Sequence, residues 1–195
     1  MVSFTASVCL FCGARSGTDP MLAEMARETG RLLARKGWRL VYGAGDIGLM
    51  GEVAHAAQEA GGQTLGVIPQ HLMQLERPRD TAVGNGRAML VVTETMHERK
   101  KVMFTNSDAA IVLPGGAGTL DEFFEVLTWA QIGLHAKPII LLDAGGFWQP
   151  LRALIDHIIA QGFADPSLRD LFTAVPDVPA LAEALERSLP PPVGR

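Results

Sequence analysis

The chain has 195 residues, of which 48% are hydrophobic, and its 21 acidic and 17 basic side chains give a formal net charge of −4. This length predicts a single domain with a large core. The acidic balance argues against a general nucleic-acid binder, and no run reaches the ~18 apolar residues that a membrane span needs. The N-terminal stretch lacks the basic region of a signal peptide, so we expect a cytoplasmic protein.

Apolar runs of strand length alternate with helical patterns along the chain. The predicted strands cover 7–11, 38–42, 64–68, 88–92, 109–113, 138–142 and 172–175. The predicted helices cover 20–36, 48–60, 95–106, 119–132, 148–161 and 177–188. Several strands are apolar at nearly every position, as in parallel strands that helices cover on both faces. We therefore predict an α/β fold, a Rossmann-like doubly wound parallel sheet with helices on both faces.

The domain is expected to span residues 1–188, and the proline-rich end 189–195 is expected to be frayed. The loop 69–87 is too long for a plain connection, which indicates a functional or mobile segment.

The two cysteines, Cys9 and Cys12, have the C-x-x-C spacing of some redox and zinc sites. The sequence has no second pair to complete a zinc site. Cys9 lies in the apolar run SVCLF, so we favour a buried strand cysteine followed by a turn cysteine, and we expect no metal.

Three glycine-rich turns follow predicted strands. They are CGARSG (12–17), YGAGDIGLMG (42–51) and LPGGAGT (113–119). In doubly wound sheets ligands bind at the carboxyl ends of the strands, which is where these turns are expected. Their convergence predicts one binding site.

The second turn contains G-x-G-x-x-G at Gly43, Gly45 and Gly48, a pattern that dinucleotide-binding proteins share. It follows the second predicted strand rather than the first, and no acidic residue ends a strand about 20 residues later. Two interpretations stay open: an NAD or FAD site, or glycines that let a helix pack closely on the sheet. We favour the second and expect no cofactor.

The GGAGT turn lies between a buried strand and a helix, so backbone N–H groups and the positive end of the helix dipole would face one spot. A phosphate suits that spot. The Gly-Lys-Ser/Thr of a P-loop is absent, which favours a monophosphate over a nucleoside triphosphate.

Two acids follow the glycines. Thr119 and Glu122 have the spacing of a capping box, with Thr119 as the N-cap, and Asp121 would then complement the helix dipole. Alternatively, the Glu122 carboxylate could reach the ribose of a nucleotide whose phosphate lies on the glycines. The sequence pattern leaves both possibilities open.

The preceding helix begins with a second predicted capping box, Thr95 to Glu98, which makes Glu98 structural. Arg99 shares a helix face with Met96 and Met103. A solvated basic face is one interpretation. The other is a buried guanidinium that meets a carboxylate such as that of Glu122, or a phosphate.

Taken together, these motifs resemble those of the LOG ("lonely guy") family. The resemblance rests on MHERK at 96–100, LPGGAGTLDE at 113–122 and EVLTWAQIGLHAKPIILL at 125–142, and it extends over nearly the whole chain. The family's signatures are P-G-G-x-G-T-x-x-E and an upstream R-K pair. Two turns differ from the family's usual sequences: YGAG stands in place of Y-G-G-G, and CGAR in place of C-G-S-S or C-G-S-R. Ala14 therefore lacks the hydroxyl that a serine would offer there.

The resemblance implies a phosphoribohydrolase, which cleaves the N-glycosidic bond of a cytokinin riboside 5′-monophosphate or AMP and releases free base and ribose 5-phosphate. It implies Glu122 and Arg99 as the catalytic pair. It also implies a homodimer, with the apolar segment 123–133 as a candidate interface. The expected phosphate- and substrate-binding residues are Gly115, Gly116, Gly118, Thr119, Lys100, Glu76, Gly13, Gly43 and Met96.

Members of the family are often labelled lysine decarboxylases, but no lysine here has a recognisable pyridoxal-phosphate setting. Two other functions stay open: a carrier of a nucleotide or of molybdenum cofactor with a related fold and no turnover, and an enzyme that acts on another phosphorylated sugar.

Overall fold

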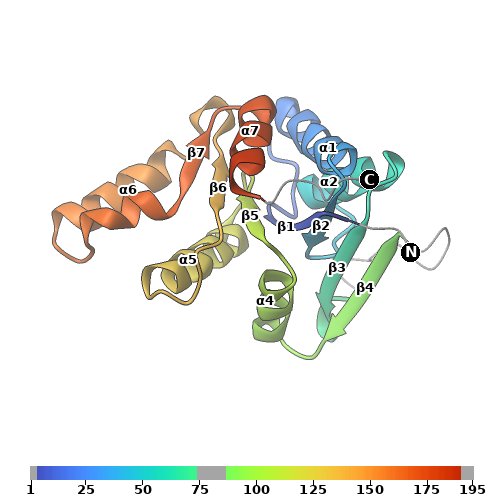
Figure 1. The fold of residues 1–195 in the computed structure, drawn as a ribbon, viewed down its shortest axis with the longest axis horizontal. Coiled ribbons are helices and arrows are strands. Elements are labelled where there is room, and N and C mark those ends of the chain that lie inside the picture. The colour runs from blue at the N-terminus through green and yellow to red at the C-terminus, as the bar shows by residue number, and fades with distance from the viewer. Residues whose placement is uncertain (1–3, 74–86, 190–195) are drawn as a thin grey trace.

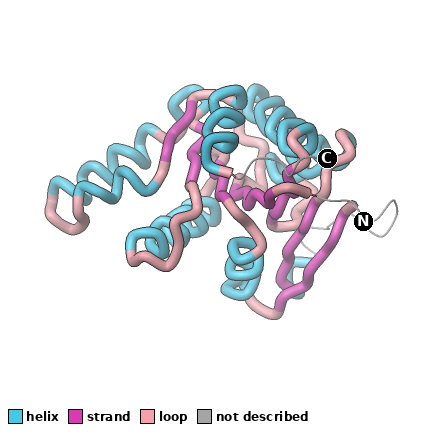
Figure 2. The backbone as a smooth tube through the Cα atoms, in the orientation of Figure 1, coloured by secondary structure: helices cyan, strands magenta, loops and turns pink. Residues whose placement is uncertain are grey.

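The computed structural model describes residues 4–73 and 87–189, and within these ranges seven strands form one sheet. Every neighbouring pair is parallel, in the order β4-β3-β2-β1-β5-β6-β7 (Figures 1 and 2). The strands are β1 (Ala6–Phe11), β2 (Trp38–Tyr42), β3 (Thr64–Pro69), β4 (Ala88–Thr93), β5 (Ala109–Val112), β6 (Ile139–Leu142) and β7 (Thr173–Val175). The predicted doubly wound parallel sheet is confirmed.

The helices follow the strands in the predicted order. They are α1 (Pro20–Arg35), α2 (Gly48–Glu59), α4 (Met96–Thr105), α5 (Ala117–Gln131), α6 (Gln149–Ala160) and α7 (Val178–Ser188). Short 3₁₀ turns, which the sequence reading did not predict, lie at Gln70–Leu72, Ala144–Gly146 and Pro166–Leu171. Most boundaries fall within one residue of the prediction, but α5 begins two residues earlier than expected.

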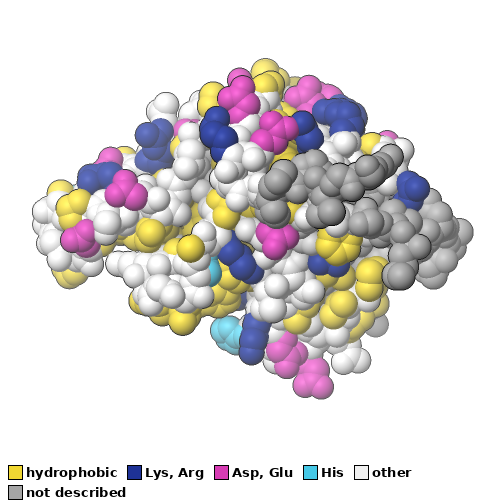
Figure 3. All heavy atoms as spheres, viewed as in Figure 1, with side chains coloured by type: hydrophobic (Ala, Val, Ile, Leu, Met, Phe, Trp, Pro, Cys, Tyr) yellow, Lys and Arg dark blue, Asp and Glu magenta, His cyan; other side chains and the backbone are white. Residues whose placement is uncertain are grey.

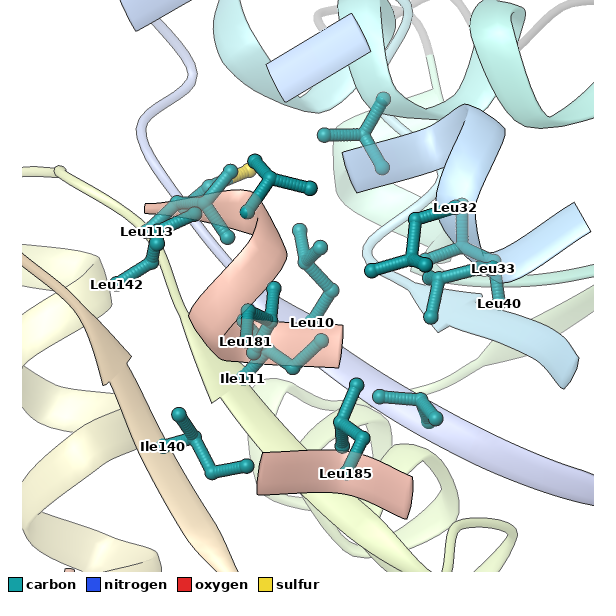
Figure 4. Close-up of a cluster of buried hydrophobic side chains, with 14 of the residues drawn as sticks. Leu10, Leu32, Leu33, Leu40, Ile111, Leu113, Ile140, Leu142, Leu181 and Leu185 are labelled. Atoms are coloured by element: carbon teal, nitrogen blue, oxygen red, sulfur yellow. The ribbon is translucent and has the colours of Figure 1, made fainter. Parts of the chain in front are cut away.

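Helices cover both faces of the sheet, and each face has its own core. One core packs β1, β2, β5 and β6 against α1, α2 and α7, and the leucines and isoleucines labelled in Figure 4 converge there. The other packs the opposite side of the strands against α4, α5 and α6. Alternate residues of β1 therefore face opposite ways: Leu10 joins the first core and Phe11 the second. This two-sided burial explains the apolar strand sequences.

Two glycines allow elements to approach closely. A Cβ on Gly30 of α1 would lie 2.2 Å from the Val53 carbonyl oxygen of α2. Gly48, the first residue of α2, has φ +62°, and a Cβ there would lie 2.3 Å from the Ala14 carbonyl carbon. The start of α2 thus lies directly against the turn after β1. The favoured interpretation was close packing of a helix on the sheet, and what Gly48 allows is close packing of the helix start against this turn.

The predicted loop 69–87 and the predicted tail 189–195 extend into residues 74–86 and 190–195, which lie outside the described ranges.

Candidate active site

A cleft of about 580 Å³ opens between the ends of β1 and β5, the point at which the strand order along the sheet changes direction. β1 and β5 are neighbours, but β2 continues the sheet on one side and β6 on the other. The segment Cys12–Gly17 after β1 and the glycine turn after β5 both line the cleft. This is the position at which doubly wound folds bind ligands, because connections leaving in opposite directions open a crevice.

The glycine turn after β5 supplies the floor. Gly116 is the N-cap of α5, and no side chain caps the helix. A Cβ on Gly116 or Gly118 would meet nothing within 4 Å, so both residues face open space. By contrast, a Cβ on Gly115 would lie 2.1 Å from Thr119 Oγ1. Backbone N–H groups at an uncapped helix N-terminus form an anion site with the helix dipole behind it.

The turn after β1 is fixed beside this floor. The Gly13 N–H donates to the Pro114 carbonyl at 3.0 Å, and a Cβ on Gly13 would lie 3.4 Å from Gly115 Cα. Gly13 therefore brings the two turns into contact, and both turns line the cleft as predicted.

Of the two interpretations left open for Thr119 and Glu122, the structure excludes the capping box with Thr119 as the N-cap. Thr119 is the third residue of α5 and is buried, while the extended backbone of Gly116 begins the helix. A glycine can serve as N-cap, and the strand before it ends at Val112, which leaves room for an earlier start. Glu122 thus lies inside the helix, and its side chain lines the cleft.

The second predicted capping box is confirmed. Thr95 Oγ1 accepts from the Glu98 N–H at 3.1 Å, and the Glu98 carboxylate accepts from the Thr95 N–H at 3.3 Å. The cap fixes the start of α4, whose first residue, Met96, lines the cleft.

Arg99 is 4% exposed, which excludes a solvated basic face. Its Nη2 donates to the Gly43 carbonyl at 3.0 Å, and its Nη1 lies 3.8 Å from Met96 Sδ. A Cβ on Gly43 would lie 1.7 Å from Nη2, so only glycine leaves room for the guanidinium here. Arg99 lines the same cleft as Glu122. Gly43 does not line the cleft itself. Its carbonyl accepts the hydrogen bond that holds Arg99, which does line the cleft.

Lys100 has a different place from the one predicted. It is 7% exposed, but it is not among the residues that line the cleft. Its Nζ binds Asp121 at 3.0 Å and Glu125 at 3.2 Å. Burial opposes the charge, but the hydrogen bonds to these carboxylates outweigh it and raise the pKa of Lys100. Asp121 lies beyond the first turn of α5, so complementing the helix dipole is not its role.

Apolar side chains form much of the remaining wall, which also includes Asp121, and two of them, Leu49 and Met50, lie in the predicted turn 42–51. They come from α1, α2, the turn after β3 and the segment before α6, namely Leu22, Leu49, Met50, Leu72 and Phe147. Phe147 is 43% exposed and stacks edge-on against Trp148. No local motif marks Leu22, Leu72 or Phe147, because each is an ordinary apolar residue whose place depends on how distant segments meet. Glu76 lies outside the described residues.

Cys9 and Cys12 are buried free thiols, in keeping with the favoured interpretation of the C-x-x-C pair. Burial, reinforced by the Glu122 carboxylate, raises the pKa of both thiols; the rise is partly offset at Cys9 by a hydrogen bond with Ser107 and at Cys12 by Arg99. Cys12 lines the cleft.

The described ranges contain no cluster of three or more His, Cys, Asp or Glu side chains placed to hold a metal ion. Nor does any helix within them have the length and apolar character to cross a membrane.

Comparison with known proteins gives consistent matches. A family model described as "possible lysine decarboxylase" matches residues 50–185. A probable cytokinin riboside 5′-monophosphate phosphoribohydrolase of Oryza sativa subsp. japonica is 46% identical over 94% of this chain and 78% of its own length. A cytokinin riboside 5′-monophosphate phosphoribohydrolase of Rhodococcoides fascians is 41% identical over 92% of this chain and 88% of its own.

Among solved structures, the molybdenum cofactor carrier protein of Chlamydomonas reinhardtii superposes with a TM-score of 0.69. The match covers 94% of this chain and 97% of the carrier at 22% identity, which shows a shared fold. The sequence relatives are much closer, and they cover nearly the whole chain. The chain belongs to the LOG family, whose matched relatives bear the name cytokinin riboside 5′-monophosphate phosphoribohydrolase.

Proposed function

We propose that this protein hydrolyses the N-glycosidic bond of nucleoside 5′-monophosphates, such as isopentenyladenosine monophosphate or AMP, and releases free base and ribose 5-phosphate. The observation that carries this proposal is the convergence in one cleft of an uncapped, glycine-lined helix N-terminus with the side chains of Arg99 and Glu122. The names of the matched relatives agree with it.

The 5′-phosphate binds at the N-terminus of α5. Gly116 and Gly118 leave open space there, so phosphate oxygens can approach the backbone N–H groups, and the Thr119 side chain lines the same floor. The helix dipole favours the negative charge. A phosphate anchored at this end directs the sugar along α5 toward Glu122.

Glu122 acts on the ribose. Breaking the bond between C1′ and the base builds positive charge on the sugar, and a carboxylate stabilises that charge more strongly in the transition state than in the ground state. A water oxygen then bonds to C1′ and gives up a proton, and the base leaves with its nitrogen protonated. In this proposal the Glu122 carboxylate also helps to orient this water.

Arg99 sets the geometry around Glu122 or contacts the nucleotide. Burial and the bond to the Gly43 carbonyl hold the guanidinium in one position, so it can act without first reorganising. The apolar wall that includes Met96, Leu72 and Phe147 offers a surface for the flat base and its substituent.

The protein is further proposed to be a cytoplasmic homodimer that needs no nucleic acid, membrane or cofactor. On the face shown in Figure 3, basic and acidic side chains are interspersed rather than gathered into one basic surface. The segment 123–133 is partly used inside the chain, since Phe123, Val126 and Leu127 are buried. Beyond them Ile132, the C-cap of α5, is 64% exposed, and Leu134 in the turn that follows is 69% exposed, so this turn offers apolar surface to a second copy.

The experiment that tests the proposed activity compares four substrates: isopentenyladenosine monophosphate, AMP, and the two corresponding nucleosides without phosphate. Free base and ribose 5-phosphate are followed by chromatography. We expect equimolar release of both products from the monophosphates and much slower release of base from the nucleosides, because only the monophosphates occupy the N-terminus of α5. Binding of the monophosphates without release of base would contradict the proposal and favour a carrier.

A further inference from the structure

Lys100 joins the two helices that hold the proposed catalytic pair. It lies on α4 next to Arg99, and its ammonium binds Asp121 and Glu125 of α5 at 3.0 and 3.2 Å. Asp121 is in turn the chain neighbour of Glu122. Each end of this ion bridge is therefore one peptide unit from a proposed catalytic residue, on helices that share one face of the sheet (Figures 1 and 2).

The bridge lies mainly outside the cleft: Lys100 and Glu125 do not line it, whereas Asp121, whose side chain is 62% exposed, does. The Lys100 side chain is 8% exposed and that of Glu125 23%, so this part of the bridge is largely shielded from water. Asp121 and Glu125 are four residues apart on one helix, so without the ammonium their like charges would repel each other. Breaking a buried ion pair at one partner leaves an uncompensated charge, whereas removing all partners need not.

We propose that Lys100 is a positioning residue: through Asp121 and Glu125 it fixes α4 against α5 and so sets the placement of Arg99 relative to Glu122. This inference rests on the proposed function. It also replaces the expectation that Lys100 binds the substrate phosphate. A displacement of about 1 Å at reacting groups can lower the rate on the order of a hundredfold. Because the bridge is one residue away from both Arg99 and Glu122, its loss is expected to lower kcat.

The test measures kcat, KM and the Kd for AMP and for ribose 5-phosphate in a set of variants. Lys100→Met keeps an unbranched side chain, one atom shorter, but removes its charge, and Lys100→Arg keeps the charge. The triple variant Lys100→Met, Asp121→Asn, Glu125→Gln removes every charge of the bridge. Lys36→Met is the matched control, since Lys36 forms an exposed ion pair with Glu186 and does not line the cleft.

We expect Lys100→Met to lower kcat at least about tenfold while both Kd values stay within about threefold. Lys100→Arg should retain much of the rate, and the triple variant should recover part of what Lys100→Met loses. Lys36→Met should behave like the wild type. A change that only destabilises the fold would lower the melting temperature, but it would not lower kcat while leaving both Kd values nearly unchanged.

Two results would overturn the inference. If Lys100→Met weakens ribose 5-phosphate binding tenfold or more at unchanged kcat, Lys100 contacts the phosphate. If its kcat equals that of the wild type, the bridge does not position the pair. A wild-type protein that releases no base contradicts the proposed function itself, which is a separate outcome.

Discussion

Arg99 lies where it does because residue 43 is a glycine. The guanidinium occupies the space that any side chain at position 43 would fill, and it bonds to the carbonyl of that same residue. At the scale of single residues, the site thus depends as much on the absence of a Cβ at position 43 as on the charged groups themselves.

We predict that Gly43→Ala leaves the fold intact but displaces Arg99. The new Cβ would lie 1.7 Å from Nη2, the far end of a flexible side chain that can move away. We expect kcat to fall at least about tenfold, because misplacement of an active-site group raises the barrier. The control is the double variant with Arg99→Met. If Gly43→Ala acts through Arg99, the double variant should be no slower than Arg99→Met alone, and additive losses would contradict this route.

The buried thiols give a prediction about pH. Burial raises the pKa of Cys9 and Cys12, so the folded protein keeps both thiols protonated at a pH where unfolded thiols lose their protons. The unfolded state then binds fewer protons than the folded state, so the free energy of unfolding falls as pH rises above about 8.5. Urea titrations at pH 7.5 and 9.5 measure this decrease. The Cys9→Ala, Cys12→Ala variant should show a smaller decrease, and an equal one would contradict the assignment.

At the scale of elements, the contact between α1 and α2 depends on Gly30. A Cβ there would lie 2.2 Å from the Val53 carbonyl oxygen and 3.0 Å from the Ala57 nitrogen, both backbone atoms that cannot turn aside. The two helices would have to separate. The start of α2 and the turn after β1 that lines the cleft are in contact at Gly48, so this packing also supports the site.

We predict that Gly30→Ala lowers the free energy of unfolding by about 3 kcal/mol, as overpacking of a tight core does. Gly118→Ala is the control, because its Cβ would meet nothing within 4 Å and alanine favours a helix by roughly 0.5–1 kcal/mol. Urea unfolding compares the two variants. Equal stability of Gly30→Ala and the wild type would show that α1 and α2 can move apart at little cost.

At the scale of the whole molecule, the proposed homodimer uses the apolar turn that follows α5, at Ile132 and Leu134. Ile132→Glu with Leu134→Glu would place two charges on this surface, and the variant should be a monomer when its mass is measured by light scattering. Met21→Glu is the control, since Met21 is 76% exposed but lies on α1, across the sheet from α5. A double variant that stays dimeric would place the interface elsewhere.

The architecture could be predicted because it depends on local patterns. Buried strands read as apolar runs and helices as periodic ones, so their order already indicates a doubly wound sheet. The two glycine turns that line the cleft were likewise recognisable, since β1 and β5 end there.

The rest of the site depends on contacts between distant segments. The partners of Lys100 lie 21 and 25 residues away on another helix, and no local spacing indicates them. Leu72 and Phe147 reach the cleft from two segments that lie far apart in the sequence. The start of α5 was misplaced because Thr119 matches a strong capping pattern, while the helix begins at a glycine.

Glu122 is proposed to act on the ribose of a nucleoside monophosphate, and release of free base by Glu122→Gln measures this role most directly. The substrates are AMP and isopentenyladenosine monophosphate, with Glu94→Gln as a control in an exposed glutamate outside the cleft. We expect the wild type and Glu94→Gln to release base, and Glu122→Gln to bind AMP but react at least about a hundredfold more slowly. Release of base by Glu122→Gln at the wild-type rate would contradict the account.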